Sequence, residues 1–169
     1  MDALSAILTR RSIRRYTDKP VPPEAVRTLL EAGMTAPSAN NKQPWHFVVI
    51  TERSILDAVP NFHPYSKMLF EAPLAILVCG DASLESNPGY MAQDCAAAVE
   101  NILIAAQGLG LGAVWLGVSP REERMEAMKK LLKIPDGFIP FALISIGYPA
   151  EEVPPSARYD ESRVHHNGW

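Results

Sequence analysis

The sequence predicts a layered α/β domain in which a buried sheet is covered by helices. The run LAILVCGD, residues 74–81, is almost continuously apolar, as expected of a central strand covered on both faces. Strand-like and helix-like apolar patterns alternate along the chain, which favours packed layers and crossover connections between parallel strands. A length of 169 residues suits one domain with a sizeable core, so we predict a single domain over residues 1–169.

The helical pattern is clearest in residues 21–33, where Pro22 and Pro23 fit the start of a helix and Gly33 fits its end. The longest expected helix spans roughly residues 90–109, and its many alanines permit close approach on several faces, so we expect it to be central. Further helices are expected over residues 2–9, 52–59, 64–72 and 120–132.

Strands are expected over residues 45–51, 74–81, 112–118 and 138–149, and the polar stretch 35–44 is expected to be a loop. The last stretch, from about residue 150, is polar and has no clear periodicity, so by itself it would be a loose tail. Val164 and Trp169 near its end suggest docking onto another surface, such as a second subunit.

Composition argues against several classes of protein. A net charge of −3 argues against a general nucleic-acid or membrane-surface role, and no apolar run is long enough to span a bilayer. The first residues lack the basic region of a secretory signal, and Cys79 and Cys95 are far apart, so we expect a reduced, cytoplasmic setting. No G-x-S-x-G motif supports a serine hydrolase. No metal site is predicted, because the histidines lack metal-ligand spacing: His46, His63, His165 and His166.

Residues 8–17, LTRRSIRRYT, place four arginines within six positions. Arg10 and Arg14 share one side in an extended chain, and they also share one side in a helix, where four residues make about one turn. Two guanidinium groups with Ser12 between them suit a phosphate, because arginine binds phosphate oxygens bidentately. A solvated basic patch paired with surface acids is an equal alternative from charge alone.

The second polar cluster lies in residues 37–45, PSANNKQPW. Its amide and hydroxyl groups suit the donor and acceptor edge of a heterocycle; they belong to Ser38, Asn40, Asn41 and Gln43. An ordinary turn-rich connection is the alternative, which the abrupt entry into a core strand at Trp45 and Phe47 weakens. The nearby GLGLGA, residues 108–113, separates a helix from the following strand, so it does not predict a dinucleotide loop.

The two motifs together, RRSIRRY and then APSANNKQPWHF, resemble the nitroreductase family of FMN-dependent oxidoreductases. The resemblance continues in the family's order through KMLFEAPLAILVCGD, QDCAAAVENILIAAQGLGLGAVWLG and IPFALISIGYPAEEVPPSARYDESRVHHNGW. It implies an α+β sandwich with a mixed, mostly antiparallel sheet flanked by helices, in place of a parallel sheet. It also implies an intertwined homodimer with FMN in the interface, in which residues from about 150 to 169 form a C-terminal arm that crosses to the partner.

The resemblance assigns cofactor-binding roles in the two motifs. The first motif matches the segment that holds the FMN phosphate, the ribityl chain and part of the flavin edge, through Arg10, Arg11, Ser12 and Arg14. The second matches a loop that approaches the isoalloxazine, usually from the other subunit, through Pro37, Ser38 and Ala39. Asn41 and Gln43 match polar positions of the same loop.

Three further matches lie outside the motifs. Lys67 matches a lysine that some members direct towards the flavin. Leu116 and Gly117 match a strand end whose backbone N–H groups approach the reactive flavin nitrogen and carbonyl. Arg158 matches a tail arginine that closes the phosphate site, although Ser156 stands where larger members have a second basic residue.

The implied activity is ping-pong hydride transfer from NADH or NADPH, through FMN, to a nitroaromatic, quinone or similar small acceptor. The flavin carries the chemistry, so no catalytic side chain is assigned. Alternatives that keep the flavin are a flavin-binding or redox-sensing protein without turnover, and a specialised enzyme such as an iodotyrosine dehalogenase. An anion-binding module without flavin is a third alternative. No nucleic-acid or membrane partner is expected.

Overall fold

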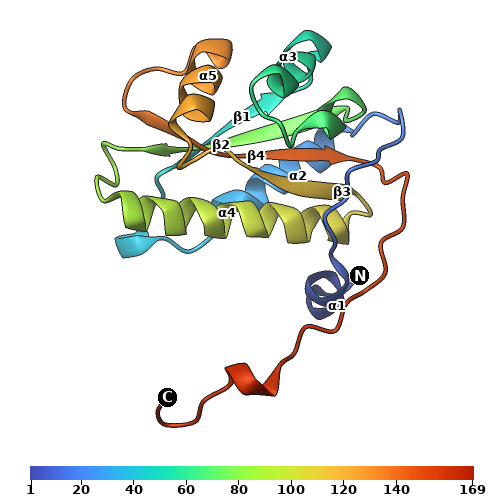
Figure 1. Cartoon of the computed structure of the whole chain (residues 1–169), viewed down its shortest axis with the longest axis vertical. Helices are drawn as coiled ribbons and strands as arrows, with labels where there is room; N and C mark the ends of the chain where they lie inside the picture. Colours follow the sequence, from blue (N-terminus) through green and yellow to red (C-terminus); the bar gives the residue numbers. More distant parts are fainter.

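One four-stranded sheet organises the computed structural model, which describes residues 1–169 (Figure 1). Its strands are β1 (Trp45–Ile50), β2 (Leu74–Asp81), β3 (Gly112–Gly117) and β4 (Phe138–Gly147), in the spatial order β1-β2-β4-β3. Every neighbouring pair is antiparallel, so the antiparallel α+β sheet implied by the resemblance is confirmed and the parallel sheet is wrong. The strands β2 and β3 do run parallel to each other, as the helical crossover between them requires. They are not neighbours, however, because β4 lies between them and is antiparallel to both.

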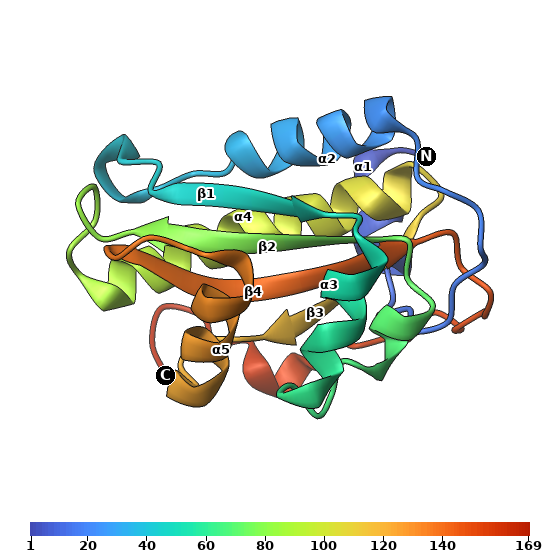
Figure 2. The ribbon, with the colours of Figure 1, turned by 90° about the horizontal axis from the view of Figure 1, so that it is seen from above.

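Helices cover both faces of this sheet. The helix α2 (Pro23–Met34) and the long helix α4 (Pro88–Gly108) lie on one face, whereas α3 (Arg53–Ala58) and α5 (Glu122–Leu132) lie on the other (Figures 1 and 2). The short helix α1 (Ala3–Thr9) packs near the C-terminal half of α4. The prediction of a helix over residues 64–72 is wrong, because this stretch forms only a 3-10 turn, Lys67–Phe70. Three further 3-10 turns are Ala39–Asn41, Val59–Asn61 and Glu161–Arg163. No helix combines the length and apolar character needed to cross a membrane.

The strand β2 is the centre of the core. Leu74, Ile76 and Val78 join the apolar layer beneath α2 and α4. Ala75 and Leu77 join the layer beneath α3 and α5. This alternation explains the continuous apolar run of residues 74–81, because both faces of the strand are buried.

The helix α4 begins where Asn87 caps it, since the Asn87 side chain accepts hydrogen bonds from the backbone N–H groups of Gly89 and Tyr90 at 2.9 and 3.3 Å. Gly33 does not end α2 as expected. It lies inside that helix, where an added Cβ would be only 3.0 Å from Ile102 Cδ1 of α4, so glycine here permits the close packing of the two helices.

The arginine segment, residues 10–15, runs along the free edge of β3. Ser12 forms a parallel bridge with Ala113, and the backbone N–H of Ile13 donates to the Ala113 carbonyl at 3.1 Å. The buried side chains of Ile13 and Tyr16 anchor the segment, and the Tyr16 hydroxyl lies 2.7 Å from the Ile13 carbonyl oxygen. The two apolar anchors face the core, so the polar side chains between them are left beside the sheet edge.

The chain after β4 leaves the body as an extended arm, residues 150–169 (Figure 1). Nearly all of its residues are exposed, and the fully exposed Trp169 stacks only on His165 of the same arm, with 4.3 Å between the ring centres. The start of the arm is hydrogen-bonded to the arginine segment at Glu151 and Pro154. The predicted docking of Val164 and Trp169 has no counterpart within one chain.

Candidate functional site

A cavity of about 470 Å³ opens at the free edge of β3, near its C-terminal end. Its volume is in the range of small-molecule sites. The residues that line it are Arg14, His63, Pro64, Tyr65, Lys67, Met68, Val114, Trp115, Leu116, Gly117 and Arg124. Three of them are cations and none is a carboxylate, so the cavity favours a ligand that carries negative charge. We call it the β3-edge cavity.

The backbone of β3 supplies hydrogen-bond groups to this cavity. The Ala113 carbonyl accepts from Ile13, so it points away from β4. Backbone groups alternate in direction along an antiparallel pair, and therefore those of Gly117 also point to the free edge. By the same alternation the N–H of Leu116 turns towards β4, and its buried side chain joins the core. Of the two predicted residues, Gly117 is thus the one that offers its N–H to the cavity.

Two side chains that the sequence did not single out hold the Gly117 carbonyl. His63 Nε2 lies 2.9 Å from this oxygen, and Arg124 Nη1 donates to it at 2.8 Å. His63 is almost completely buried, and burial lowers its imidazole pKa; the hydrogen bond to Gly117 opposes this, and the charge of Arg124 adds to the lowering. A neutral imidazole with its proton on Nε2 satisfies the carbonyl, so His63 acts as a fixed donor.

The arginine segment divides between several partners. Arg14 lines the β3-edge cavity, whereas Arg10 Nε lies 3.4 Å from Glu100 Oε1 on α4. The predicted convergence of these two arginines is not seen within one chain, because α1 ends at Thr9 and the backbone beyond it is irregular. Neither the helical nor the extended spacing therefore applies from residue 10 to residue 14.

Arg11 lines a second cavity of about 530 Å³, between α1 and the start of the arm. Its Nε donates to the Pro154 carbonyl at 2.8 Å, and its Nη1 donates to the Arg10 carbonyl at 2.7 Å. Its Nη2 is buried without a hydrogen-bond partner. A buried guanidinium nitrogen without a partner is costly, so it marks a position where an acceptor would be favourable.

The polar groups of the loop 37–43 mainly shape the loop itself. The Ser38 hydroxyl accepts from the backbone N–H of Gln43 at 2.9 Å, and the Gln43 side chain donates to Asn41 Oδ1 at 2.9 Å. The backbone of Asn40, Asn41 and Gln43 is left-handed, with φ of 52°, 56° and 50°. Asparagine tolerates this conformation better than most residues, which explains the pair of asparagines.

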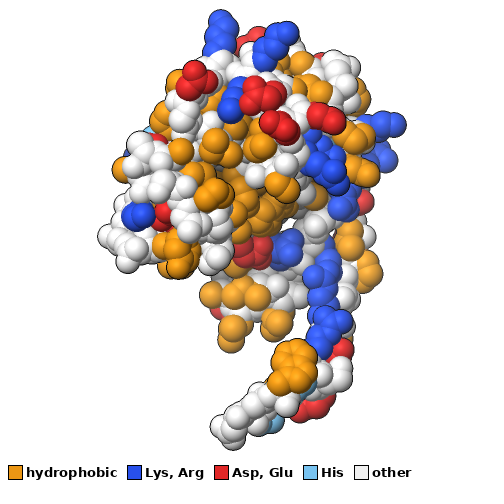
Figure 3. Space-filling model, turned by 60° about the vertical axis from the view of Figure 1, so that its left-hand side comes forward, with side chains coloured by type: hydrophobic (Ala, Val, Ile, Leu, Met, Phe, Trp, Pro, Cys, Tyr) orange, Lys and Arg blue, Asp and Glu red, His pale blue; other side chains and the backbone are white.

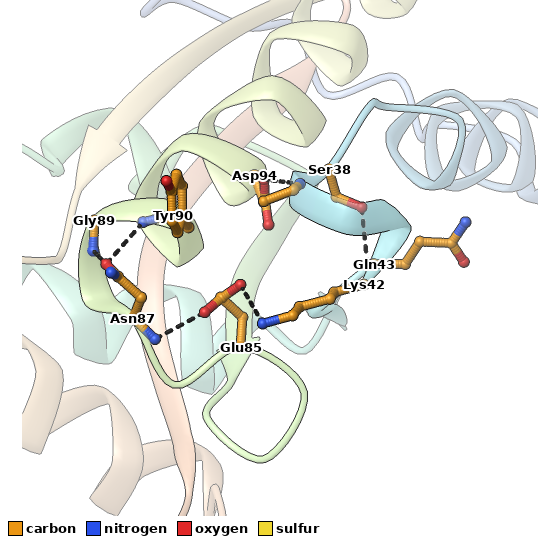
Figure 4. Close-up of polar contacts among 9 residues, drawn as sticks. Ser38, Lys42, Gln43, Glu85, Asn87, Gly89, Tyr90 and Asp94 are labelled. Atoms are coloured by element: carbon orange, nitrogen blue, oxygen red, sulfur yellow. Dashed lines mark hydrogen bonds and ion pairs between the residues drawn. The ribbon is translucent and has the colours of Figure 1, made fainter.

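Two buried acids fasten this loop to the body (Figure 4). Asp94 Oδ1 on α4 accepts from the backbone N–H of Ala39 at 2.9 Å. Glu85 accepts from Lys42 Nζ and from the Asn87 N–H, both at 2.8 Å. The hydrogen bond from Lys42, followed by that from Asn87, holds the pKa of the Glu85 carboxyl below its usual range. Asp94 therefore has a structural role, because it holds the backbone of the loop.

The two predicted parts of the site lie on opposite edges of the sheet. The loop 37–43 leads into β1, while the cavity lies beside β3, with β2 and β4 between them. Three spacings between strands amount to roughly 14 Å. Within one chain, the β3-edge cavity brings together Arg14, Lys67, Leu116 and Gly117. The loop residues lie away from this cavity, at the other edge of the sheet: Pro37, Ser38, Ala39, Asn41 and Gln43. Arg158 lies on the exposed arm, where its Nε is 3.4 Å from Ser156 Oγ.

The hydrogen-bond donors and positive charges at the site match the acceptor atoms and negative charge of FMN. Arg14 and Lys67 make no ion pair with an acid, and the Gly117 N–H is directed to an edge without a partner strand. These groups suit a ligand that carries negative charge and has a ring with acceptor atoms. The unpaired nitrogen of Arg11 offers a further place for an acceptor in the second cavity.

Comparisons with known proteins show the family of this chain. The nitroreductase family model matches residues 7–62 and 60–148. A protein of Methanothermobacter thermautotrophicus, named "Putative NADH dehydrogenase/NAD(P)H nitroreductase", is 50% identical over 169 residues, which are 100% of this chain and 88% of the relative.

Two solved structures have the same fold. A crystal structure from Parabacteroides distasonis, which bears the same name, is 42% identical with a TM-score of 0.95 and covers 99% of this chain and 98% of its own. A "putative nitroreductase in complex with fmn" from Desulfovibrio desulfuricans is 37% identical with a TM-score of 0.86, over 100% of this chain and 98% of its own. The family model and these relatives span nearly the whole sequence, and the chain belongs to the nitroreductase family, a family of oxidoreductases.

Proposed function

We propose that this protein is an FMN-dependent oxidoreductase that takes electrons from NADH or NADPH and passes them to a small acceptor such as a nitroaromatic or a quinone. The observation that carries this proposal is the β3-edge cavity, where Arg14, Lys67 and the Gly117 N–H meet without any carboxylate. Family membership and the relative solved with FMN support the choice of cofactor.

The bound FMN would supply the hydride and electron transfer. Arg14 and Lys67 place positive charge beside the ligand, and Gly117 offers a backbone N–H from a strand held in the sheet. Donors fixed in advance stabilise negative charge that develops during a reaction, as in an oxyanion site. The role of these residues is therefore to bind, orient and stabilise charge, and no side chain is needed as an acid or a base.

We further propose that the working form is a homodimer. The helix α1 exposes Leu4, Ile7 and Leu8 at 70%, 51% and 69%, and the adjoining arm extends away from the body (Figure 3). Exposed apolar faces of this kind are typical of protein interfaces. A second copy would cover α1 and receive the arm. It would also bring its loop 37–43 to the β3-edge cavity, which one chain does not do.

Anaerobic spectroscopy tests the proposed activity. NADH or NADPH is expected to bleach the visible flavin bands of the purified protein, and a quinone or nitroaromatic is expected to restore them. Bands that bleach but do not recover with any acceptor would indicate a flavin-binding or redox-sensing protein without turnover. Bands that no reduced nicotinamide bleaches would contradict the assignment of the electron donor.

A further inference from the structure

Arg124 is the cation of the β3-edge cavity that the proposed flavin contacts leave unassigned. It lies in the first turn of α5, and it is partly buried. Its Nη1 donates to the Gly117 carbonyl, and no carboxylate lies within ion-pair distance of its guanidinium. A guanidinium has five N–H donors in a planar fork, so most of its capacity to bind an anion is free.

Arg124 lies further along β3 than the point where the arginine segment meets the strand, although Arg14 of that segment lines the same cavity. That segment meets β3 at Ala113, whereas Arg124 binds Gly117, four residues further along the strand. Four residues of a strand extend roughly 13 Å. If the arginine segment holds the phosphate end of the cofactor, Arg124 lies towards the ring end, where electrons are exchanged.

An exposed aromatic ring stands beside Arg124 at this end. The Tyr65 side chain also lines the cavity and is 71% exposed. The Arg124 guanidinium carbon lies 5.6 Å from the centre of the Tyr65 ring, which keeps the cation beside an open aromatic surface. A cation next to an exposed ring suits a planar molecule that carries a negative charge.

We propose that Arg124 binds a carboxylate or phosphate group on the molecule that exchanges electrons with the flavin, and that Tyr65 contacts the planar part of that molecule. The inference rests on the proposed function and deepens it, because it names the substrate class as planar molecules with an anionic group. The anion has two possible sources, a carboxylate on the electron acceptor or the 2′-phosphate of NADPH.

Arg124 can be replaced without leaving the Gly117 carbonyl unpaired, which allows a test by substitution. His63 Nε2 contacts the same oxygen at 2.9 Å, so the carbonyl keeps a donor when Arg124 is replaced. We therefore expect Arg124→Gln to fold and to retain FMN. The matched control is Arg121→Gln, which removes an exposed arginine at the start of the same helix, outside the cavity.

The kinetic test uses two matched pairs of substrates with the FMN-loaded protein: 4-nitrobenzoate against 4-nitrobenzamide, and NADPH against NADH. We expect Arg124→Gln to lower kcat/KM for the member of one pair that carries the additional carboxylate or 2′-phosphate, by roughly ten- to a hundredfold and mainly through KM. The member without that group and the Arg121→Gln control should be unchanged, and Arg124→Lys should fall between. The pair that responds identifies the source of the anion.

A binding test does not depend on turnover. Oxidised holoprotein is titrated with benzoate, benzamide, adenosine 2′,5′-bisphosphate or AMP while shifts of the flavin bands are followed. Weaker binding of benzoate or of the bisphosphate to Arg124→Gln, with benzamide and AMP unaffected, supports the proposal. Equal binding and equal kinetic ratios in wild type and Arg124→Gln overturn it, even if the enzyme is active. Protein that lacks FMN would instead refute the proposed function itself.

Discussion

Arg14 and Arg15 are sequence neighbours with different surroundings. Arg14 lines the β3-edge cavity, whereas Arg15 Nε lies 3.0 Å from Glu71 Oε2 on the surface. We expect Arg14→Ala to raise the Kd for FMN by roughly ten- to a hundredfold, because a hydrogen bond to a charged group is lost. Arg15→Ala should leave the Kd unchanged. Fluorescence titration of FMN measures both values, and equal effects of the two substitutions would contradict the assignment of Arg14.

Glu85 predicts a specific dependence of stability on pH. Its carboxyl pKa lies below the ordinary value of 4.5, because Lys42 and the Asn87 N–H stabilise the charged form. A lowered pKa contributes stability that is complete above the unfolded-state value and is lost as the pH falls through the folded-state value. The Tm of wild type should therefore decrease when the pH is lowered below about 4.5, and the Tm of Glu85→Gln should decrease less over the same pH range. Parallel Tm curves for the two proteins would show that this ion pair does not contribute.

The two cysteines should be chemically inert in the folded protein. Burial raises the thiol pKa of Cys79 to about 12 and that of Cys95 to about 12, and nearby Cys79 and Asp94 add to the effect on Cys95. The thiolate is the reactive form, so neither residue should react with an aromatic disulfide reagent at pH 8. Two equivalents should react after unfolding in guanidinium. Rapid reaction in the folded state would contradict the burial of these side chains.

At the scale of elements, the contact between β3 and the arginine segment depends on Gly112. An added Cβ at Gly112 would lie 2.6 Å from Ile13 Cγ2 and 2.8 Å from Ile13 Cβ, which is too close. We expect Gly112→Ala to displace the segment from the sheet edge, and so to weaken FMN binding as well as to lower stability. Gly108→Ala is the matched control, because a Cβ there meets nothing within 4 Å.

Helical alanine is favoured over glycine by roughly 0.5–1 kcal/mol, so the control should leave stability equal or higher. Thermal unfolding and FMN titration of both variants test the expectation. If Gly112→Ala bound FMN as tightly as wild type, the placement of the arginine segment against β3 would be wrong.

The sequence predicted the bounds of helices and strands better than the order and direction of the strands in the sheet. The strand at residues 74–81 has the predicted bounds, because a strand buried on both faces leaves an unbroken apolar run. The order of strands was not available from local patterns, since the insertion of β4 between β2 and β3 is a long-range pairing. The antiparallel sheet was predicted by the family resemblance and could not be predicted from hydrophobic periodicity.

The same limit applies to the site. Arg14, Lys67 and Gly117 were predicted from the family resemblance, and they line one cavity. Arg124 was missed because it stands in a charged helix, PREERMEAMKKLL, where an arginine is typical of a solvated face. His63 was missed because its partner is a backbone carbonyl 54 residues away, which leaves no signal in side-chain spacing.

At the scale of the whole molecule, the exposed face of α1 predicts association. Leu4→Asp with Leu8→Asp would place two charges in the proposed interface, where they would be costly to bury. We expect this variant to elute as a monomer in light-scattering chromatography and to lose FMN, while wild type is a dimer. Val49→Asp, which changes another exposed apolar residue on the edge strand β1, should remain dimeric. A monomeric wild type that retains FMN would contradict the shared site.

The most direct measurement is the visible absorbance spectrum of the purified protein, with release and quantification of any chromophore. The account predicts flavin bands and close to one FMN per chain, either as purified or after addition of FMN. A colourless protein that also fails to take up added FMN would contradict it, and the arginine segment would then be a basic patch without an assigned ligand.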